Sequence, residues 1–185
     1  MNNKGIEIRD NLLSEEDFKK VYDVIMGDQF PWYWNEGVVE YDDGHNQFTH
    51  RFYFDYAPTS EYIEALNPIM KELHALAVIR IKANLIPKAD RIVEHGMHVD
   101  CTIVNEGQAR TAVFYLDDSN GYTIMDDGTK VESIKNRLVT FPTEMFHTGT
   151  SCTDLERRVI LNFNYIEAPE TQIDMTAKDG SRIKI

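Results

Sequence analysis

The second half of the chain contains six short runs of β-branched and aromatic residues, with no helical pattern between them. The runs cover residues 78–86, 97–104, 110–116, 122–125, 137–141 and 157–166. Turn sequences rich in Asp, Asn and Gly, for example at 105–107 and 126–128, separate them. Strands that follow one another without intervening helices are typical of antiparallel sandwiches and barrels, and they argue against βαβ units. The sequence therefore predicts a mainly β fold, a sandwich or jelly roll.

Two helices are predicted in the first part of the chain. Ser14 and Asp17 have the spacing of a capping box at the start of the first helix. Its apolar residues, at the spacing of one buried face, are Phe18, Val21, Tyr22 and Ile25. Gly27 is placed to end this helix, and a second helix is predicted over residues 60–77, where Pro68 should kink or split it. We expect both helices to pack on one outer face of the sheet.

A length of 185 residues fits a single domain with one hydrophobic core. Within residues 1–185, the pattern indicates an N-terminal helical support (about 1–77), a β core (about 78–166) and a C-terminal extension (about 167–185). No repeat or low-complexity segment interrupts this order.

The charge of the chain limits its partners. The sequence has 31 acidic and 19 basic residues, which give a formal net charge of −12. Such a surface repels phosphate backbones and anionic lipids, so nucleic acid and membranes are disfavoured as partners. The longest apolar stretch, residues 75–79, is too short to span a bilayer, and the first residues lack the apolar run of a signal peptide. With only two cysteines, we expect a cytoplasmic protein, and no pattern indicates its oligomeric state.

Three residues form a candidate metal site. His98 and Asp100 lie two residues apart on a predicted strand, so their side chains should share one face. An imidazole and a carboxylate suit a divalent transition metal, although such a pair also arises by chance. His147 ends a strand and turn that we place at the rim of the same barrel. The pattern thus offers two histidines and one carboxylate to a metal ion.

The last predicted strand has two different faces. One face carries Arg158, Ile160, Asn162 and Asn164, and the other carries Val159, Leu161 and Phe163. The apolar face should be covered by helices, which leaves Arg158 pointing into the barrel. Because a buried unpaired charge is costly, Arg158 should have an anionic partner there. Its neighbour Arg157 lies on the opposite face and should reach solvent.

These residues together resemble the iron(II)- and 2-oxoglutarate-dependent oxygenases, and among them the small prolyl-4-hydroxylase-like branch found in bacteria and phages. The matched pattern is the His98–Asp100 pair, the distal His147, and Arg158 eleven positions further on. Tyr115, in the segment RTAVFYLDD, occupies the place of a tyrosine that helps to hold 2-oxoglutarate in that branch. The segment NGYT at 120–123 is similar to the glycine-rich turn of the family, with one glycine replaced by Asn. The match covers roughly residues 78–166.

The resemblance implies a double-stranded β-helix, a jelly-roll or cupin-like barrel with N-terminal helices packed on its major sheet. It implies that His98, Asp100 and His147 bind Fe(II) and are the catalytic centre. Arg158 and Tyr115 would bind the distal carboxylate of 2-oxoglutarate. The implied reaction hydroxylates a peptidyl or free amino acid with O2, converts 2-oxoglutarate to succinate and CO2, and accepts ascorbate as an optional reductant. The partner would be a small-molecule or peptide substrate.

Two alternatives remain open at this point. A cupin-like metal-dependent isomerase, or a dioxygenase that needs no oxo acid, could use the same three ligands, although cupins more often present HxH and a later Glu. A non-catalytic binding module with a vestigial metal site is the other alternative. Activity without 2-oxoglutarate would favour the first, and failure to bind iron would favour the second.

Several further side chains have two interpretations each. The aromatic segment 30–34 either forms a wall of the substrate pocket or packs against the first helix. On the predicted strand 78–86, Arg80, Lys82 and Asn84 share a face that either lines a pocket or lies at a solvated sheet edge. His95 is spaced to point away from the metal, and we expect it to be a loop histidine.

Overall fold

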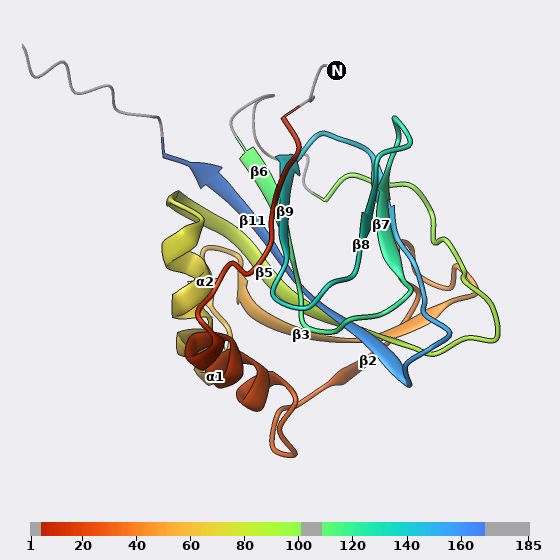
Figure 1. Ribbon diagram of the computed structural model, residues 1–185, viewed down its shortest axis with the longest axis horizontal. Helices are drawn as coiled ribbons and strands as arrows, with labels where there is room; N and C mark the ends of the chain where they lie inside the picture. Colours follow the sequence, from red (N-terminus) through yellow and green to blue (C-terminus); the bar gives the residue numbers. More distant parts are fainter. Residues whose placement is uncertain (1–4, 101–108, 169–185) are drawn as a thin grey trace, which may run out of the picture.

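The structure, a computed structural model, describes residues 5–100 and 109–168. The larger of its two sheets has eight strands, in the order β1 (Glu7–Arg9), β9 (Leu138–Pro142), β6 (Ala109–Tyr115), β11 (Arg157–Glu167), β5 (Ala75–Pro87), β3 (Asn46–Phe54) and β2 (Tyr33–Glu36), with β4 (Ala57–Pro58) paired to β3. The smaller sheet has three strands, in the order β10 (His147–Gly149), β7 (Tyr122–Met125) and β8 (Lys130–Glu132). Figure 1 shows the smaller sheet facing one side of the larger sheet. This pair of facing antiparallel sheets confirms the predicted jelly roll.

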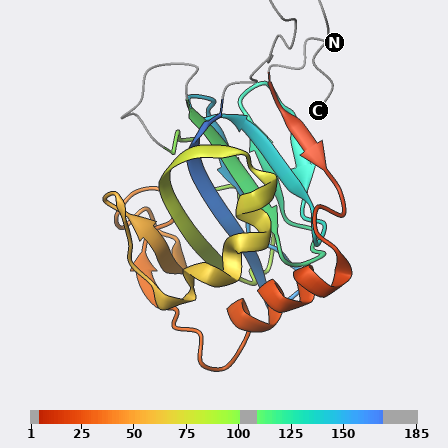
Figure 2. The ribbon, with the colours of Figure 1, turned by 90° about the vertical axis from the view of Figure 1, so that its left-hand side faces the viewer.

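Three helical segments cover the other side of the larger sheet. They are α1 (Glu15–Ile25), the 3-10 helix η1 (Glu61–Leu66) and α2 (Asn67–Glu72). Figure 2 shows the helices packed across this face, away from the smaller sheet. None of the helices in the described ranges is long and apolar enough to cross a membrane.

The first helix begins where its sequence predicts. The Ser14 hydroxyl accepts a hydrogen bond from the backbone N–H of Asp17, at 3.1 Å, and so satisfies one of the free donors at the helix start. Val21 and Ile25 are fully buried, and Phe18 packs against the same core. The amphipathic spacing therefore identified both the helix and the face that it buries.

The second predicted helix is shorter than its sequence pattern indicates. The segment splits into η1 and α2, with Pro68 in the first turn of α2, as expected for a residue that lacks a backbone N–H donor. The predicted end at residue 77 is wrong, because α2 ends at Glu72. His74 then adopts a positive φ of 48°, which breaks the helical path, and β5 starts at Ala75.

Five of the six predicted strands correspond to β5, β6, β7, β9 and β11. The strand predicted over residues 97–104 is wrong in its described part: residues 97–100 form only an isolated bridge between His98 and His147, and residues 101–104 lie outside the described residues. The segment before Ala75 contributes β1 to β4 as well as helices. Of the expected C-terminal extension, residues 169–185 also lie outside the described residues.

The hydrophobic core has two parts, one on each side of the larger sheet. The part beneath the helices joins Val159, Leu161 and Phe163 of β11 to Val21, Ile25, Leu66 and Ile69 of the helices. The part between the sheets is smaller and includes Val113, Tyr115, Met125, Val131, Val139 and Phe141. The apolar face of β11 is thus covered by helices, as its alternation predicted. Its other face turns toward the interior between the sheets.

Candidate active site

Two histidines and one aspartate meet between the sheets. One potential ligand atom from each of His98, Asp100 and His147 lies within 4.8 Å of the others. The Asp100 carboxylate oxygens lie 3.8 Å from His98 Nε2 and 3.7 Å from His147 Nε2. The backbones of the two histidines hold each other through two hydrogen bonds of 3.0 Å. The structure therefore brings together the three residues that the sequence singled out.

The imidazole rings are oriented with their Nε2 atoms toward Asp100. His98 Nδ1 donates to the carbonyl of Gly96 at 3.0 Å, and His147 Nδ1 donates to the carbonyl of Met145 at 3.1 Å. Because a carbonyl can only accept, these bonds place the ring proton on Nδ1 and leave the Nε2 lone pair free. Burial lowers the pKa of His147, which favours its neutral form. Two imidazole nitrogens and one carboxylate are a donor set that fits a divalent transition metal.

Asp100 is held by three side chains of the larger sheet. Arg80 Nη2 donates to one carboxylate oxygen at 2.9 Å, and Asn162 and Asn164 donate to the other at 2.8 Å and 3.1 Å. Arg80 Nε also donates to Asn164 Oδ1, which ties β5 to β11. Burial alone would raise the pKa of Asp100, but the charges of Arg80 and His147 and the two asparagine donors hold it well below its usual range. The carboxylate is therefore ionised and fixed in orientation.

Arg158 is a buried cation whose contacts are neutral. The side chain is only 1% exposed, and burial lowers its pKa. Its guanidinium donates to Ser133 Oγ at 2.7 Å, to Thr123 Oγ1 at 3.3 Å and to the Thr150 carbonyl at 3.4 Å, and it lies 5.5 Å from the Tyr115 ring centre. Within the described residues no carboxylate forms an ion pair with it, so the anionic partner expected from the sequence is not a side chain of this part of the protein. Such a cation is suited to bind an anionic ligand.

Tyr115 lies beside this cation, as the sequence resemblance implied. The ring is fully buried between the sheets, and its hydroxyl donates to Thr123 Oγ1 at 2.8 Å. The same threonine oxygen accepts from Arg158. Thr123, Ser133 and Thr150 were not identified from the sequence, because isolated hydroxyl residues carry no pattern of their own.

Two glycines leave room for the guanidinium. A Cβ atom at Gly121 would lie 2.6 Å from Arg158 Cδ and 2.7 Å from the Ser151 carbonyl oxygen, well inside contact distance. A Cβ atom at Gly149 would lie 3.4 Å from Arg158 Nη1. The glycine in the NGYT segment is therefore required by the close approach of Arg158.

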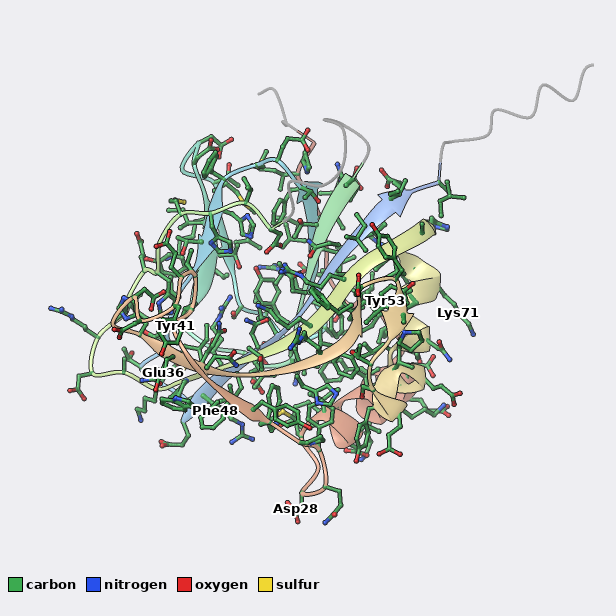
Figure 3. All side chains as sticks on the ribbon, turned by 180° about the vertical axis from the view of Figure 1, so that it is seen from behind. Asp28, Glu36, Tyr41, Phe48, Tyr53 and Lys71 are labelled. Carbon is green, nitrogen blue, oxygen red and sulfur yellow. The ribbon has the colours of Figure 1, made fainter. Side chains whose placement is uncertain are left out.

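An open cavity of about 1220 Å³ lies along β2, β3 and β5, beside the cluster of His98, Asp100 and His147. Arg80 links the two places, since it lines the cavity and contacts Asp100. The three candidate ligands are not among the residues that line the cavity. At the end of β2, Glu36 lines the cavity and accepts a hydrogen bond from Tyr41, and Figure 3 shows these two residues side by side.

The aromatic segment 30–34 is divided between the hydrophobic core and the cavity. Phe30 is buried in the core beneath the helices and meets Trp32 edge-on, with ring centres 5.1 Å apart. Tyr33 and Trp34 are more than half exposed and line the cavity. The segment therefore packs against the core at one end and forms a pocket wall at the other.

The sheet-edge interpretation of Arg80, Lys82 and Asn84 is wrong. Their strand, β5, lies between β11 and β3, and all three side chains face the interior between the sheets. The error follows from β3, which sequence reasoning did not identify. A bulge between Arg51 and Tyr53 shifts its pairing with β5, and the burial of its side chains does not follow a simple alternation.

The two remaining expectations concern Arg157 and His95. Arg157 is exposed, whereas Arg158 is buried, which agrees with the strand alternation. His95 lies in an irregular segment and is not part of the metal cluster, but it is buried rather than exposed, with its ring 4.9 Å from that of His45. Burial is the main reason why its pKa falls to about 4.

No protein-family model matches the chain, and neither does the sequence of any curated protein. Several solved structures do match its fold. A prolyl hydroxylase from Trichoplax adhaerens, in complex with a peptide fragment of the hypoxia-inducible factor oxygen degradation domain, has a TM-score of 0.64 and 14% identity over 89% of this chain and 85% of its own. A Pseudomonas putida prolyl-4-hydroxylase has a TM-score of 0.58 and 16% identity over 90% of this chain and 94% of its own.

An epimerase has a similar fold. SnoN, a non-heme α-ketoglutarate-dependent epimerase from nogalamycin biosynthesis, has a TM-score of 0.60 and 11% identity over 89% of this chain and 77% of its own. The chain therefore has the double-stranded β-helix fold of the 2-oxoglutarate- and iron-dependent oxygenases. Prolyl hydroxylases are among the structures of that fold that it matches, which confirms, at the level of the fold, the resemblance noted in the sequence.

Proposed function

We propose that this protein is an Fe(II)- and 2-oxoglutarate-dependent dioxygenase that hydroxylates a peptidyl or free amino acid. The observation that carries the proposal is the His98–Asp100–His147 cluster in the same interior as a buried guanidinium, Arg158, that has only neutral contacts. Oxygenases with the same fold support it. In the overall reaction a substrate C–H bond becomes C–OH, and O2 and 2-oxoglutarate are consumed to give succinate and CO2.

Each group in the interior has a part in this reaction. His98, Asp100 and His147 would hold the iron, which together with 2-oxoglutarate and O2 supplies the oxidising power. Arg80, Asn162 and Asn164 keep the Asp100 carboxylate ionised and correctly turned.

At the other end of the interior, Arg158 binds the distal carboxylate of 2-oxoglutarate, and we assign Tyr115 the role of a second donor. The apolar side chains around Tyr115 keep water away from this contact.

The first prediction compares two adjacent arginines. Arg158→Ala should raise KM for 2-oxoglutarate by about 30-fold or more, because it removes a buried charged contact of the carboxylate. Arg157→Ala, which changes an exposed neighbour on the same strand, should leave that KM unchanged. The measurement is succinate formation in the presence of iron(II) and ascorbate. An unchanged KM in Arg158→Ala would contradict the assignment of the oxo-acid pocket.

The matched epimerase gives a reason to test a second outcome at the same site. A hydroxylase adds one oxygen atom to its substrate, whereas an epimerase leaves the mass unchanged and inverts a stereocentre. Mass spectrometry and chiral chromatography of the product distinguish these outcomes. Turnover of a substrate without any 2-oxoglutarate would instead favour the cupin-like alternative.

A further inference from the structure

Three basic side chains gather on the inner face of β3 and β5, next to Asp100. Arg51 of β3 lies opposite Lys82 of β5, and Lys82 lies opposite Asn162 of β11. All three cations, Arg51, Arg80 and Lys82, line the cavity along β2, β3 and β5. This concentration of positive charge is unusual in a chain whose formal net charge is −12.

Among these cations, Lys82 has no partner in the described part of the chain. Arg80 forms an ion pair with Asp100, and the Arg51 guanidinium lies over the Phe54 ring, 5.0 Å from its centre. Lys82 is partly buried and forms no hydrogen bond or ion pair with any described residue. Burial first, and then the charges of Arg80 and Arg51, lower its pKa to about 8, although the charge of Asp100 acts in the opposite direction. A partly buried ammonium group in this position would be stabilised by an anion bound in the cavity.

Asn162, opposite Lys82, has a buried acceptor that lacks a hydrogen-bond donor. Asn162 donates its amide N–H to Asp100, and because a carboxylate only accepts, the amide oxygen must point elsewhere. That oxygen is buried and has no partner. A buried acceptor without a partner is rare and calls for an N–H or O–H donor. A donor and an acceptor, each without a partner, thus face the interior from adjacent strands.

We propose that the substrate is a free amino acid, with its carboxylate on Lys82 and its ammonium group donating to Asn162 Oδ1. The proposal rests on the function proposed above and chooses between its two substrate classes. A free amino acid carries the anion and the donor on one carbon atom, its Cα. A residue inside a peptide has neither charged group and leaves Lys82 without an anion. Arg51, on the exposed side of Lys82, adds a second positive charge that attracts the carboxylate.

The substrate test uses the twenty amino acids, each as the free acid, as the amide and as the C-terminal residue of a dipeptide, in the succinate assay. We expect at least one free acid to stimulate succinate formation, and its amide to have a KM at least tenfold higher. A dipeptide whose KM equals that of the free acid would show that the carboxylate bound can be that of a peptide C-terminus, and this result would overturn the proposal. An amide that is as good as the acid would also overturn it. If no free acid stimulates succinate formation, the binding measurement described below decides between failure of this proposal and failure of the oxygenase proposal.

Variants of Lys82 test the contact itself. Lys82→Met should raise KM for the stimulating amino acid at least tenfold and leave KM for 2-oxoglutarate unchanged, and Lys82→Arg should restore most of the affinity. Lys71→Met is the matched control, because Lys71 points from α2 into solvent on the far side of the sheet (Figure 3). A rise in KM for 2-oxoglutarate in Lys82→Met would assign Lys82 to the oxo acid and overturn the proposal.

Calorimetry separates this proposal from the proposed function. The twenty free amino acids are titrated into the iron(II)-loaded protein, without oxygen or 2-oxoglutarate. Binding of a free acid that Lys82→Met weakens supports the Lys82 contact even if 2-oxoglutarate does not bind, in which case only the oxygenase proposal fails. Binding that is equal in the parent and in Lys82→Met overturns the contact, whatever the outcome of the turnover assay.

Discussion

At the scale of single residues, Arg158 illustrates how a buried charge depends on its uncharged neighbours. Its guanidinium is positioned by hydroxyl and carbonyl groups and by the absence of a side chain at Gly121. The alternation along β11 was sufficient to predict that Arg158 points inward and Arg157 outward, because side-chain direction in a strand is a local property. The neighbours of Arg158 come from other strands and have no such local signal.

Gly121→Ala tests this dependence. The new methyl group would lie 2.6 Å from Arg158 Cδ and 2.7 Å from the Ser151 carbonyl oxygen, so the arginine and the backbone around it must shift. We expect KM for 2-oxoglutarate to rise by about tenfold or more, since a shift of about 1 Å in a binding group has effects of this size. Iron(II) affinity, measured by titration without oxygen, should not change and serves as the control. A variant with the parent's KM for 2-oxoglutarate would show that Arg158 does not bind it.

At the scale of elements, the strand β3, which was not predicted from the sequence, is the reason why the environment of β5 was not predicted either. The bulge after Arg51 shifts the register of β3 against β5, and pairing between these two strands joins residues far apart in the chain. Without β3, the sequence cannot distinguish a pocket-lining face on β5 from a solvated sheet edge. The structure brings His98, Asp100 and His147 together although His98 does not lie in a regular strand. The identities and order of the residues carried the prediction of this group.

The loop between β2 and β3, which lines the cavity, depends on one carboxylate. Asp43 accepts hydrogen bonds from the backbone N–H groups of Val38, Val39, Glu40 and His45. Burial would raise the pKa of Asp43, but these four donors outweigh it and lower the pKa to about 2. A group whose pKa is lowered by folding stabilises the folded state at pH values above its pKa in the unfolded state, near 3.8. This stabilisation is lost as the pH falls toward 2.

We therefore expect Asp43→Ala to lower the free energy of unfolding by about 1–3 kcal/mol at pH 7. Denaturant unfolding at several pH values measures this difference, which should shrink as the pH falls from about 4 to about 2, where the parent carboxylate becomes protonated. Glu40→Ala, an exposed change in the same loop, is the control and should have an effect below about 0.5 kcal/mol. A difference that does not depend on pH would contradict the role of the ionised carboxylate.

At the scale of the whole molecule, the larger sheet separates two environments. Its outer face is apolar and is covered by α1, η1 and α2, while its inner face presents charged and polar groups toward the smaller sheet. The helix-supported sheet thus positions Arg158 on β11 and Lys82 on β5, and its side chains Arg80, Asn162 and Asn164 hold Asp100, which lies outside the strands. The layered fold was predictable from the apolar pattern, whereas the charged interior required the pairing of the strands.

The central claim is that His98, Asp100 and His147 bind iron(II) and that Arg158 binds the 2-oxoglutarate held beside it. The most direct measurement is anaerobic: iron(II) and then 2-oxoglutarate are added to the protein, and the weak visible charge-transfer band of the chelate is recorded, with His147→Ala beside it. We predict a band in the parent protein that is absent in His147→Ala and requires higher 2-oxoglutarate concentrations in Arg158→Ala. No band in a parent protein that is shown to bind iron would contradict the claim.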